Sequence, residues 1–204
     1  MTIERAALLA GIERLTAAME RDFEELNTVD GALGDGDLGV TMSRGMRAIS
    51  EQADGLPEDL GLALLACAQA FTKTSGSSYG TLLATGMMAM AKEVKGRTDV
   101  PAAEVSALVA LARDKMQTRG KADLGGKTVL DSLDAVARAT EGKSGEVEVA
   151  DAAARAVTDA LAAFRDRKAT VGRARIFGDK SVGMDDPGML AMTRIVKALA
   201  DREE

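Results

Sequence analysis

Residues 29–42 read VDGALGDGDLGVTM and carry three carboxylates, those of Asp30, Asp35 and Asp37, among four glycines. Glycine takes tight turns and positive φ angles at little steric cost. The segments on both sides have the apolar spacing of helices. The stretch therefore predicts a rigid loop between two helices.

The crowding of these three carboxylates predicts a cation site. Carboxylates at sequence spacings of five and two repel one another unless a cation neutralises them. Mg²⁺ suits such oxygen ligands and commonly shares its coordination shell with phosphates. The alternative is an acidic, solvent-exposed turn, because Asp and Gly are the commonest turn residues. We favour the cation site because the glycines enclose all three carboxylates in one loop.

The composition indicates an all-α protein. Of the 204 residues, 2% are aromatic and 3 are prolines, and β-branched residues rarely alternate with period two. We expect a core of Leu, Ala, Met and Val between helices, with Cys67 as a small buried residue. The length suits a single domain over residues 1–204.

The apolar spacing predicts eight helices. They are expected at about residues 2–27, 38–53, 58–73, 80–95, 102–118, 129–140, 147–169 and 187–201. Asp99 is a plausible N-cap, and Pro101 suits the first helical position that follows it.

The loops between these helices are of two kinds. Three are short and polar, at residues 54–57, 96–101 and 141–146. Four are long or rich in glycine, at residues 28–37, 74–80, 119–128 and 170–188. Alternate loops of an up-and-down bundle lie at the same end, and the four unusual loops alternate with the three short ones. We therefore predict an eight-helix antiparallel up-and-down barrel or bundle with its chemistry at one end.

Several function classes are excluded. The chain has no histidine, which removes Ser–His–Asp and Cys–His centres, imidazole zinc sites and a phosphohistidine intermediate. The net charge of −6 argues against direct binding of nucleic acid. We find neither 18 consecutive apolar residues nor a basic and then apolar leader, so we expect a cytoplasmic protein without a membrane span.

Three further loops suggest anion binding. Residues 72–81, TKTSGSSYGT, could form an anion nest or a plain Ser/Gly loop. Residues 119–128, RGKADLGGKT, fail as a P-loop because Gly126 stands where the lysine belongs, although a backbone contact with a nucleotide remains open. Residues 172–188, GRARIFGDKSVGMDDPG, offer Arg173 for bidentate phosphate contact, or merely surface charge.

Taken together and in order, GDGDLG, SGSSYGT, GGKTVLDSL and GRARIFGDKSVGMDDPG resemble the nucleotide-binding L subunit of dihydroxyacetone kinases. The resemblance spans roughly the whole chain. It implies an eight-helix antiparallel barrel with the nucleotide at one end, in agreement with the loop pattern.

The resemblance also implies site residues. Asp30, Asp35 and Asp37 match the ligands of two Mg²⁺ ions that bridge the phosphates of ADP or ATP. The positions that match nucleotide contacts are Leu38, Gly39, Val40, Thr41, Thr74, Ser75, Gly120, Val129, Arg173, Asp186, Pro187 and Gly188. The sequence offers no convincing general base, so no catalytic residue is assigned.

The implied activity is phosphoryl transfer from a Mg²⁺-held nucleotide to a short-chain ketose on a separate K subunit. A phosphohistidine M subunit recharges bound ADP in some relatives, whereas others exchange ATP. Leu38 and Thr41 stand where the family usually has His and Asn. A kinase for another ketose such as a tetrulose, a nucleotide sensor without turnover, and a metal-stabilised structural bundle are therefore alternatives.

Overall fold

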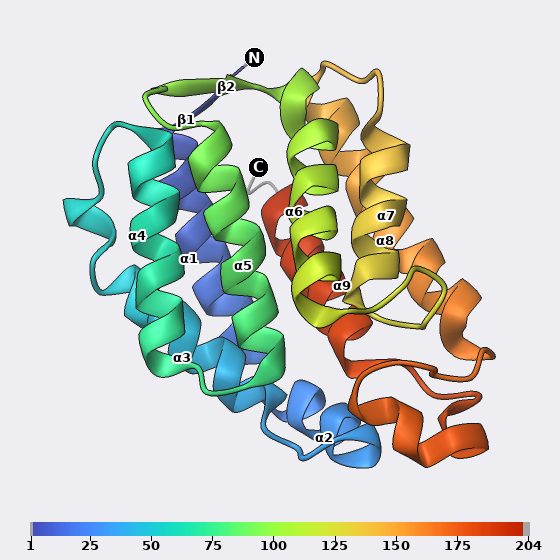
Figure 1. Cartoon of the computed structure of the whole chain (residues 1–204). Coiled ribbons are helices and arrows are strands. Elements are labelled where there is room, and N and C mark those ends of the chain that lie inside the picture. Colours follow the sequence, from blue (N-terminus) through green and yellow to red (C-terminus); the bar gives the residue numbers. More distant parts are fainter. Residues whose placement is uncertain (1, 202–204) are drawn as a thin grey trace.

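Helices account for most of residues 2–201, the part of the chain that the computed structural model describes (Figure 1). The α-helices are α1 (Arg5–Arg21), α2 (Phe23–Leu33), α3 (Leu38–Ser50), α4 (Leu60–Thr74), α5 (Ser78–Glu93), α6 (Val105–Gly120), α7 (Val129–Thr140), α8 (Glu146–Arg165) and α9 (Pro187–Ala200). Short 3-10 helices cover Ala53–Gly55, Ala102–Glu104 and Arg173–Ser181. Two strands, β1 (Thr2–Glu4) and β2 (Asp99–Pro101), complete the fold.

Eight of these helices close a ring. Each of α3 to α8 packs against the next helix in the chain, and α1 packs against both α9 and α3. Helix α2 lies outside the ring and packs against α3 and α9 at one end. The predicted eight-helix barrel is confirmed.

The aspartate loop begins later than the sequence predicted. The expected helix over residues 2–27 is broken at Asp22, whose carboxylate pairs with Arg21 and Arg194. Helix α2 then continues the chain in a new direction as far as Leu33. Asp30 therefore lies near the end of a helix, while Asp35 and Asp37 lie in the loop that follows.

The small antiparallel sheet corrects two expectations. Residues 2–4 form β1 instead of helix, and Asp99 and Pro101 belong to β2 instead of a helix start. Ile3 lies opposite Val100 and packs near Leu60 and Val94. Burial of these apolar side chains favours the strand pair over a longer first helix.

The barrel interior is apolar. Met19, Met42 and Phe71 are buried between the first half of the helices, and Met116 and Val157 are buried in the second half. Cys67 is buried as predicted, and burial raises the pKa of its thiol to about 11.

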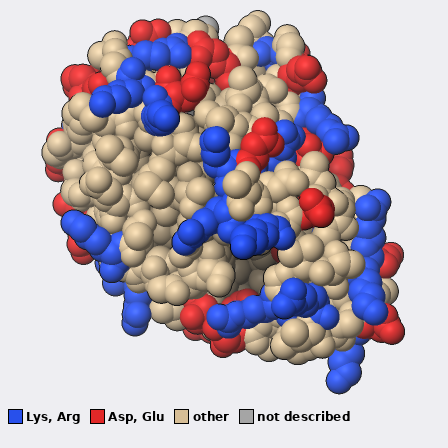
Figure 2. Space-filling model, in the orientation of Figure 1, with Lys and Arg blue, Asp and Glu red and all other residues tan. Residues whose placement is uncertain are grey.

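The outer surface over α4 and α5 is nearly free of charge. Figure 2 shows this broad face, where residues 60–91 carry one charged side chain, that of Lys73. Even so, none of the helices within residues 2–201 has both the length and the apolar composition of a membrane span.

Candidate functional site

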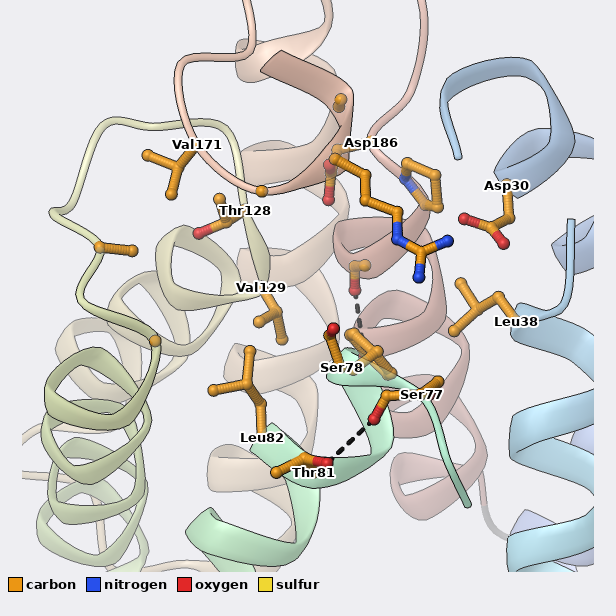
Figure 3. A pocket seen from close by; sticks show the side chains of 18 of the residues that line it. Asp30, Leu38, Ser77, Ser78, Thr81, Leu82, Thr128, Val129, Val171 and Asp186 are labelled. Carbon is orange, nitrogen blue, oxygen red and sulfur yellow. Dashed lines mark hydrogen bonds between the residues drawn. The ribbon is translucent and has the colours of Figure 1, made fainter. Parts of the chain in front are cut away.

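A cavity of about 630 Å³ opens at the end of the barrel where α2 lies (Figure 3). Its walls come from the α2–α3 connection, the start of α5, the end of α6 with the start of α7, and residues 171–188. These segments belong to the four unusual loops and their flanking helix ends. The prediction that these loops share one end is confirmed.

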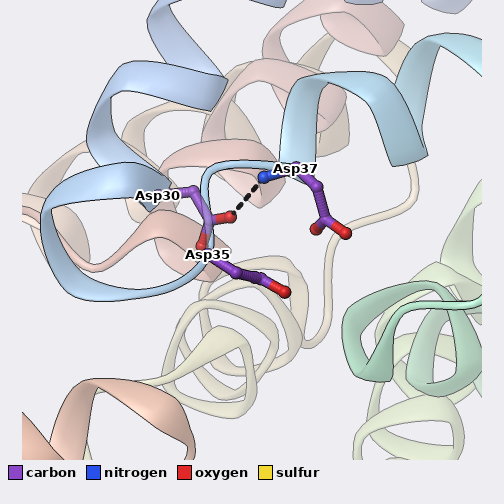
Figure 4. Close-up of side chains that lie close together, drawn as sticks. All are labelled: Asp30, Asp35 and Asp37. Carbon is purple, nitrogen blue, oxygen red and sulfur yellow. Dashed lines mark hydrogen bonds between the residues drawn. The ribbon is translucent and has the colours of Figure 1, made fainter.

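Three carboxylates meet at the mouth of this cavity. One oxygen from each of Asp30, Asp35 and Asp37 lies within 4.8 Å of the others (Figure 4). The amide of Asp37 donates a hydrogen bond of 3.0 Å to Asp30 Oδ2. Gly36, at a φ of 76°, makes the tight turn between the two loop aspartates. The end of α2 and the loop that follows it therefore hold three like charges close together.

The charge of this group is visible in the pKa of Asp30. Partial burial raises the pKa of Asp30 most, and the nearby Asp35 carboxylate raises this pKa further. The hydrogen bond from the Asp37 amide lowers it. A cation between the three groups would relieve this cost. Carboxylate oxygens are also the ligands that Mg²⁺ prefers.

Arg173 faces the aspartates from the opposite wall. Its guanidinium pairs with the Asp35 carboxylate, and this partner raises the pKa of the arginine. Gly172, at a φ of 67°, precedes it and allows the chain to turn toward the cavity. An arginine here can meet a phosphate in a bidentate way.

The third wall is the beginning of α5. Ser77 caps this helix by accepting a hydrogen bond from the Gly80 amide, and Thr81 donates its hydroxyl hydrogen to the Ser77 carbonyl. The Tyr79 hydroxyl donates to the carbonyl of Gly188, so α5 is joined to the start of α9. The serine hydroxyls and the helix N-terminus give this wall a preference for anions.

Asp186 closes the floor of the cavity. It is buried at the N-terminus of α9, where its carboxylate accepts a hydrogen bond of 2.9 Å from the Met189 amide. Burial raises the pKa of this carboxyl to about 7, although the amide and the nearby Lys127 act to lower it.

Apolar side chains complete the cavity. Leu38, Leu82, Met116 and Val129 line it together with the polar groups above. An apolar pocket of this size with a few converging polar groups is typical of small-molecule sites.

The cavity includes seven of the twelve nucleotide-contact positions that the sequence suggested. These are Leu38, Gly120, Val129, Arg173, Asp186, Pro187 and Gly188. Gly39, Val40, Thr41, Thr74 and Ser75 lie outside its lining. The amides of Gly39 and Val40 donate to Asn27 Oδ1 instead. The contact of all twelve with a nucleotide stays a prediction.

Sequence reasoning missed several lining residues. Ser77, Ser78, Tyr79 and Thr81 belong to a motif that was recognised, but only Thr74 and Ser75 of it were singled out. Thr128 also lines the cavity, and it forms a capping box with Asp131 at the start of α7. The Thr-x-x-Asp spacing of that box is visible in the sequence.

Comparisons with known proteins agree with this geometry. The family model described as the DAK2 domain matches residues 32–201. The ADP-binding subunit DhaL of the PEP-dependent dihydroxyacetone kinase 1 of Listeria innocua is 26% identical over 204 residues, which cover 100% of this chain and 99% of that subunit. The L-erythrulose 1-kinase of Mycolicibacterium smegmatis is 32% identical, over 95% of this chain and 35% of that protein.

A solved structure has the same fold. The dihydroxyacetone kinase from C. freundii in complex with AMP-PNP and Mg²⁺ superposes with a TM-score of 0.75 at 24% identity, over 98% of this chain and 34% of that one. The chain thus spans about a third of the two longer kinases and nearly all of the Listeria subunit.

Proposed function

This chain belongs to the DAK2 domain family, and from that premise we propose that it is the nucleotide-binding subunit of a dihydroxyacetone-type ketose kinase. It would hold ADP or ATP with two Mg²⁺ ions at the cavity end of the barrel. The observation that carries this proposal is the meeting of three carboxylates with Arg173 at the mouth of one cavity.

The donor set fits the ions. Asp30, Asp35 and Asp37 would be the protein ligands, because their oxygens already lie within 4.8 Å of one another. When bound, Mg²⁺ supplies neutralisation of phosphate charge and alignment of the transferring group.

The other walls suit the rest of a nucleotide. The cavity of about 630 Å³ falls within the ordinary range for small-molecule sites. Arg173 would turn from Asp35 to a phosphate, and Ser77 and Ser78 would offer hydrogen bonds to phosphate oxygens. Leu38, Leu82 and Val129 would cover the apolar faces of the nucleoside.

The phosphoryl acceptor is proposed to lie on another chain. The Listeria relative, 99% of which is covered in the comparison, is the ADP-binding subunit of a dihydroxyacetone kinase. We propose a K-type subunit that binds the ketose and supplies the general base. A phosphohistidine M-type subunit is proposed as the phosphoryl source if ADP stays bound. The ketose is proposed to be dihydroxyacetone or a tetrulose such as erythrulose.

Calorimetry tests the nucleotide site. ADP is titrated into the purified chain with Mg²⁺ and again in the presence of a chelator. We expect binding with Mg²⁺ and a loss of most of that binding without it. Equal binding under both conditions, or none under either, would contradict the metal-dependent site.

A reconstituted assay tests the reaction. The chain is mixed with a cognate K subunit, a ketose and either ATP or a phosphorylated M subunit, and sugar phosphate is measured. Formation of sugar phosphate with only ATP or only the phosphorylated M subunit identifies the phosphoryl donor. Parallel reactions with dihydroxyacetone and with erythrulose identify the ketose. Nucleotide binding without product from any combination would favour a nucleotide sensor.

A further inference from the structure

Lys127 is buried although it carries a charge. Its side chain is 1% exposed, and its ammonium donates three hydrogen bonds, to the carbonyl oxygens of Arg165 at 2.8 Å, Arg167 at 2.9 Å and Ser181 at 2.7 Å. An ammonium has three donors, so all of them are used. Burial lowers the pKa of this lysine, and the charges of Asp186, Asp185 and Asp166 oppose that effect only in part.

The three acceptors lie at the two stems of one loop. Arg165 and Arg167 lie at the C-terminal end of α8 and just after it, and Ser181 lies at the end of the 3-10 helix that precedes α9. The Ser181 hydroxyl also accepts from the Ala169 amide and donates to the Gly178 carbonyl. Residues 168–180 are therefore a loop whose base is closed by the lysine together with the hydrogen bonds between Arg165 and Gly183, and Arg173 lies within that loop.

The same lysine belongs to the opposite wall of the cavity. It precedes Thr128 and Val129, which line the cavity, and its own backbone has a φ of 62°. A non-glycine residue at positive φ is uncommon and carries some strain. The Gly126 carbonyl beside it accepts a hydrogen bond from the Thr170 amide. Lys127 thus joins the wall that begins α7 to the wall that carries Arg173.

We propose that Lys127 is the positioning residue of this site: its ammonium closes the base of the 168–180 loop and so fixes Arg173 opposite Asp30, Asp35 and Asp37. This inference rests on the proposed function, because Arg173 is the residue through which Lys127 acts on the nucleotide.

The chemistry of the contact explains why a lysine is needed. A methionine has a similar length and fills the same space, but it takes one donor away from each of three carbonyl oxygens. The Arg165 and Ser181 oxygens keep the amides of Gly183 and Met184 as donors, whereas within residues 2–201 the Arg167 oxygen loses its donor. The weakened bonding of these oxygens then favours loop conformations that expose them to water. Arg173 would sample many positions, and less of the protein would be ready to bind phosphate.

The test compares Lys127→Met, Arg173→Ala and the double variant. Lys121→Met is the matched control, because Lys121 lies in the same loop at a φ of 50° but is exposed and outside the cavity lining. Hydrogen exchange without nucleotide should be faster in residues 168–181 of Lys127→Met, and unchanged in Lys121→Met. Affinity for ADP with Mg²⁺ should fall about tenfold in Lys127→Met, which is the lower end of the loss seen when a group that orients a metal ligand is removed.

The double variant separates positioning from a general loss of structure. If Lys127 acts by placing Arg173, the double variant binds ADP about as well as Arg173→Ala alone. Independent losses that multiply would overturn the proposal. Unchanged exchange in residues 168–181 would also overturn it, and that result does not depend on whether the wild type binds ADP.

Lys127→Gln provides a second variant that retains an amide donor. Its loop exchange and its affinity should lie between those of Lys127→Met and the wild type. Global unfolding of both variants would overturn the proposal, because Lys127 would then be needed by the whole fold. A wild type that binds no ADP would refute the proposed function instead.

Discussion

Two aspartates begin helices at opposite ends of this barrel, and their environments differ sharply. Asp59 caps α4 at the end away from the cavity, where its two carboxylate oxygens accept from the amides of Leu62 and Gly96, and these bonds lower its pKa. Asp186 caps α9 in the cavity floor, where it accepts from the Met189 amide and burial raises its pKa to about 7. At the far end the hydrogen bonds stabilise the ionised form of the capping carboxylate, whereas at the cavity end burial disfavours that form.

The difference extends to the other charged groups of the two ends. Away from the cavity, Arg97 pairs with both carboxylate oxygens of Glu104, so opposite charges meet at short range. At the cavity, three carboxylates face one another and Arg173 pairs with one of them. At the far end the charged groups stabilise one another, whereas the cavity end keeps like charges close together, which is typical of binding sites.

The largest expected effect comes from removing the like charges. The double variant Asp35→Ala/Asp37→Ala should weaken ADP binding in the presence of Mg²⁺ by about a thousandfold, because loss of a residue that fixes a metal costs at least ten- to a hundredfold. Its unfolding temperature without ligand should stay the same or rise, since repelling carboxylates are gone. Calorimetry and thermal melts measure the two effects.

Asp123→Ala is the control for that experiment. Asp123 is exposed at the same end of the barrel but does not line the cavity. Its removal should leave ADP affinity unchanged. A large loss in this variant would mean that overall charge, and not the aspartate group, governs binding.

The next effect concerns the buried cap. The folded protein holds the Asp186 proton up to a pH of about 7, whereas an unfolded Asp releases it near its ordinary value of 3.8. The unfolded state therefore binds fewer protons between these pH values, and this group makes the protein less stable as pH rises. From pH 5 to pH 8 the loss should be about 2–3 kcal/mol.

Asp186→Asn should lack this pH dependence. Asn also caps helices, and one carbonyl oxygen is enough for the single amide of Met189. Urea unfolding at pH 5 and pH 8 should show the variant gaining stability relative to the wild type as pH rises. A parallel pH dependence in both proteins would show that Asp186 is already ionised at pH 5.

Two glycines test the packing of the two ends. A Cβ on Gly39 would press on the Phe23 carbonyl oxygen and lie 2.8 Å from Asn27 Oδ1, while one on Gly61 would lie 2.5 Å from the Ala91 carbonyl oxygen. Substitution of either by Ala should lower the free energy of unfolding by about 1–3 kcal/mol. Urea unfolding measures both losses.

Only the Gly39 variant should also affect binding. Gly39 lies in α3 where this helix packs against the backbone of α2, so an added methyl group moves Asp30 relative to Asp37. Gly61 lies in the first turn of α4, where it packs against the end of α5 away from the cavity. Its variant should bind ADP within about twofold of the wild type. Equal losses of affinity would mean that the two ends are mechanically coupled.

The local part of this architecture could be predicted from the sequence. The helix over residues 129–140 has the predicted bounds because Thr128 and Asp131 define its start within four residues. The order of helices and loops alone placed four loops at one end. These features depend on neighbours in the chain, which a single sequence displays.

The parts that were missed depend on distant partners. Ile3 forms a strand because Val100 lies opposite it, and no pattern in the sequence near Ile3 predicts that pairing. Lys127 looks like a surface lysine in a glycine-rich loop, but its acceptors come 38 to 54 residues later. Asp186 has an ordinary cap sequence, and only the closed barrel buries it.

The smallest expected effect is at Asp59, the helix cap away from the cavity. Asp59 uses two oxygens for two amides, and Asn offers only one acceptor, so Asp59→Asn should lower the unfolding temperature slightly at pH 7. The folded-state pKa of Asp59 is lowered, so its contribution is present above the ordinary value of 3.8 and is lost as pH falls below it. The difference from the wild type should therefore shrink in acid, whereas that of Asp186→Asn grows toward alkaline pH. A change of ADP affinity in Asp59→Asn would show that this end of the barrel also serves the site.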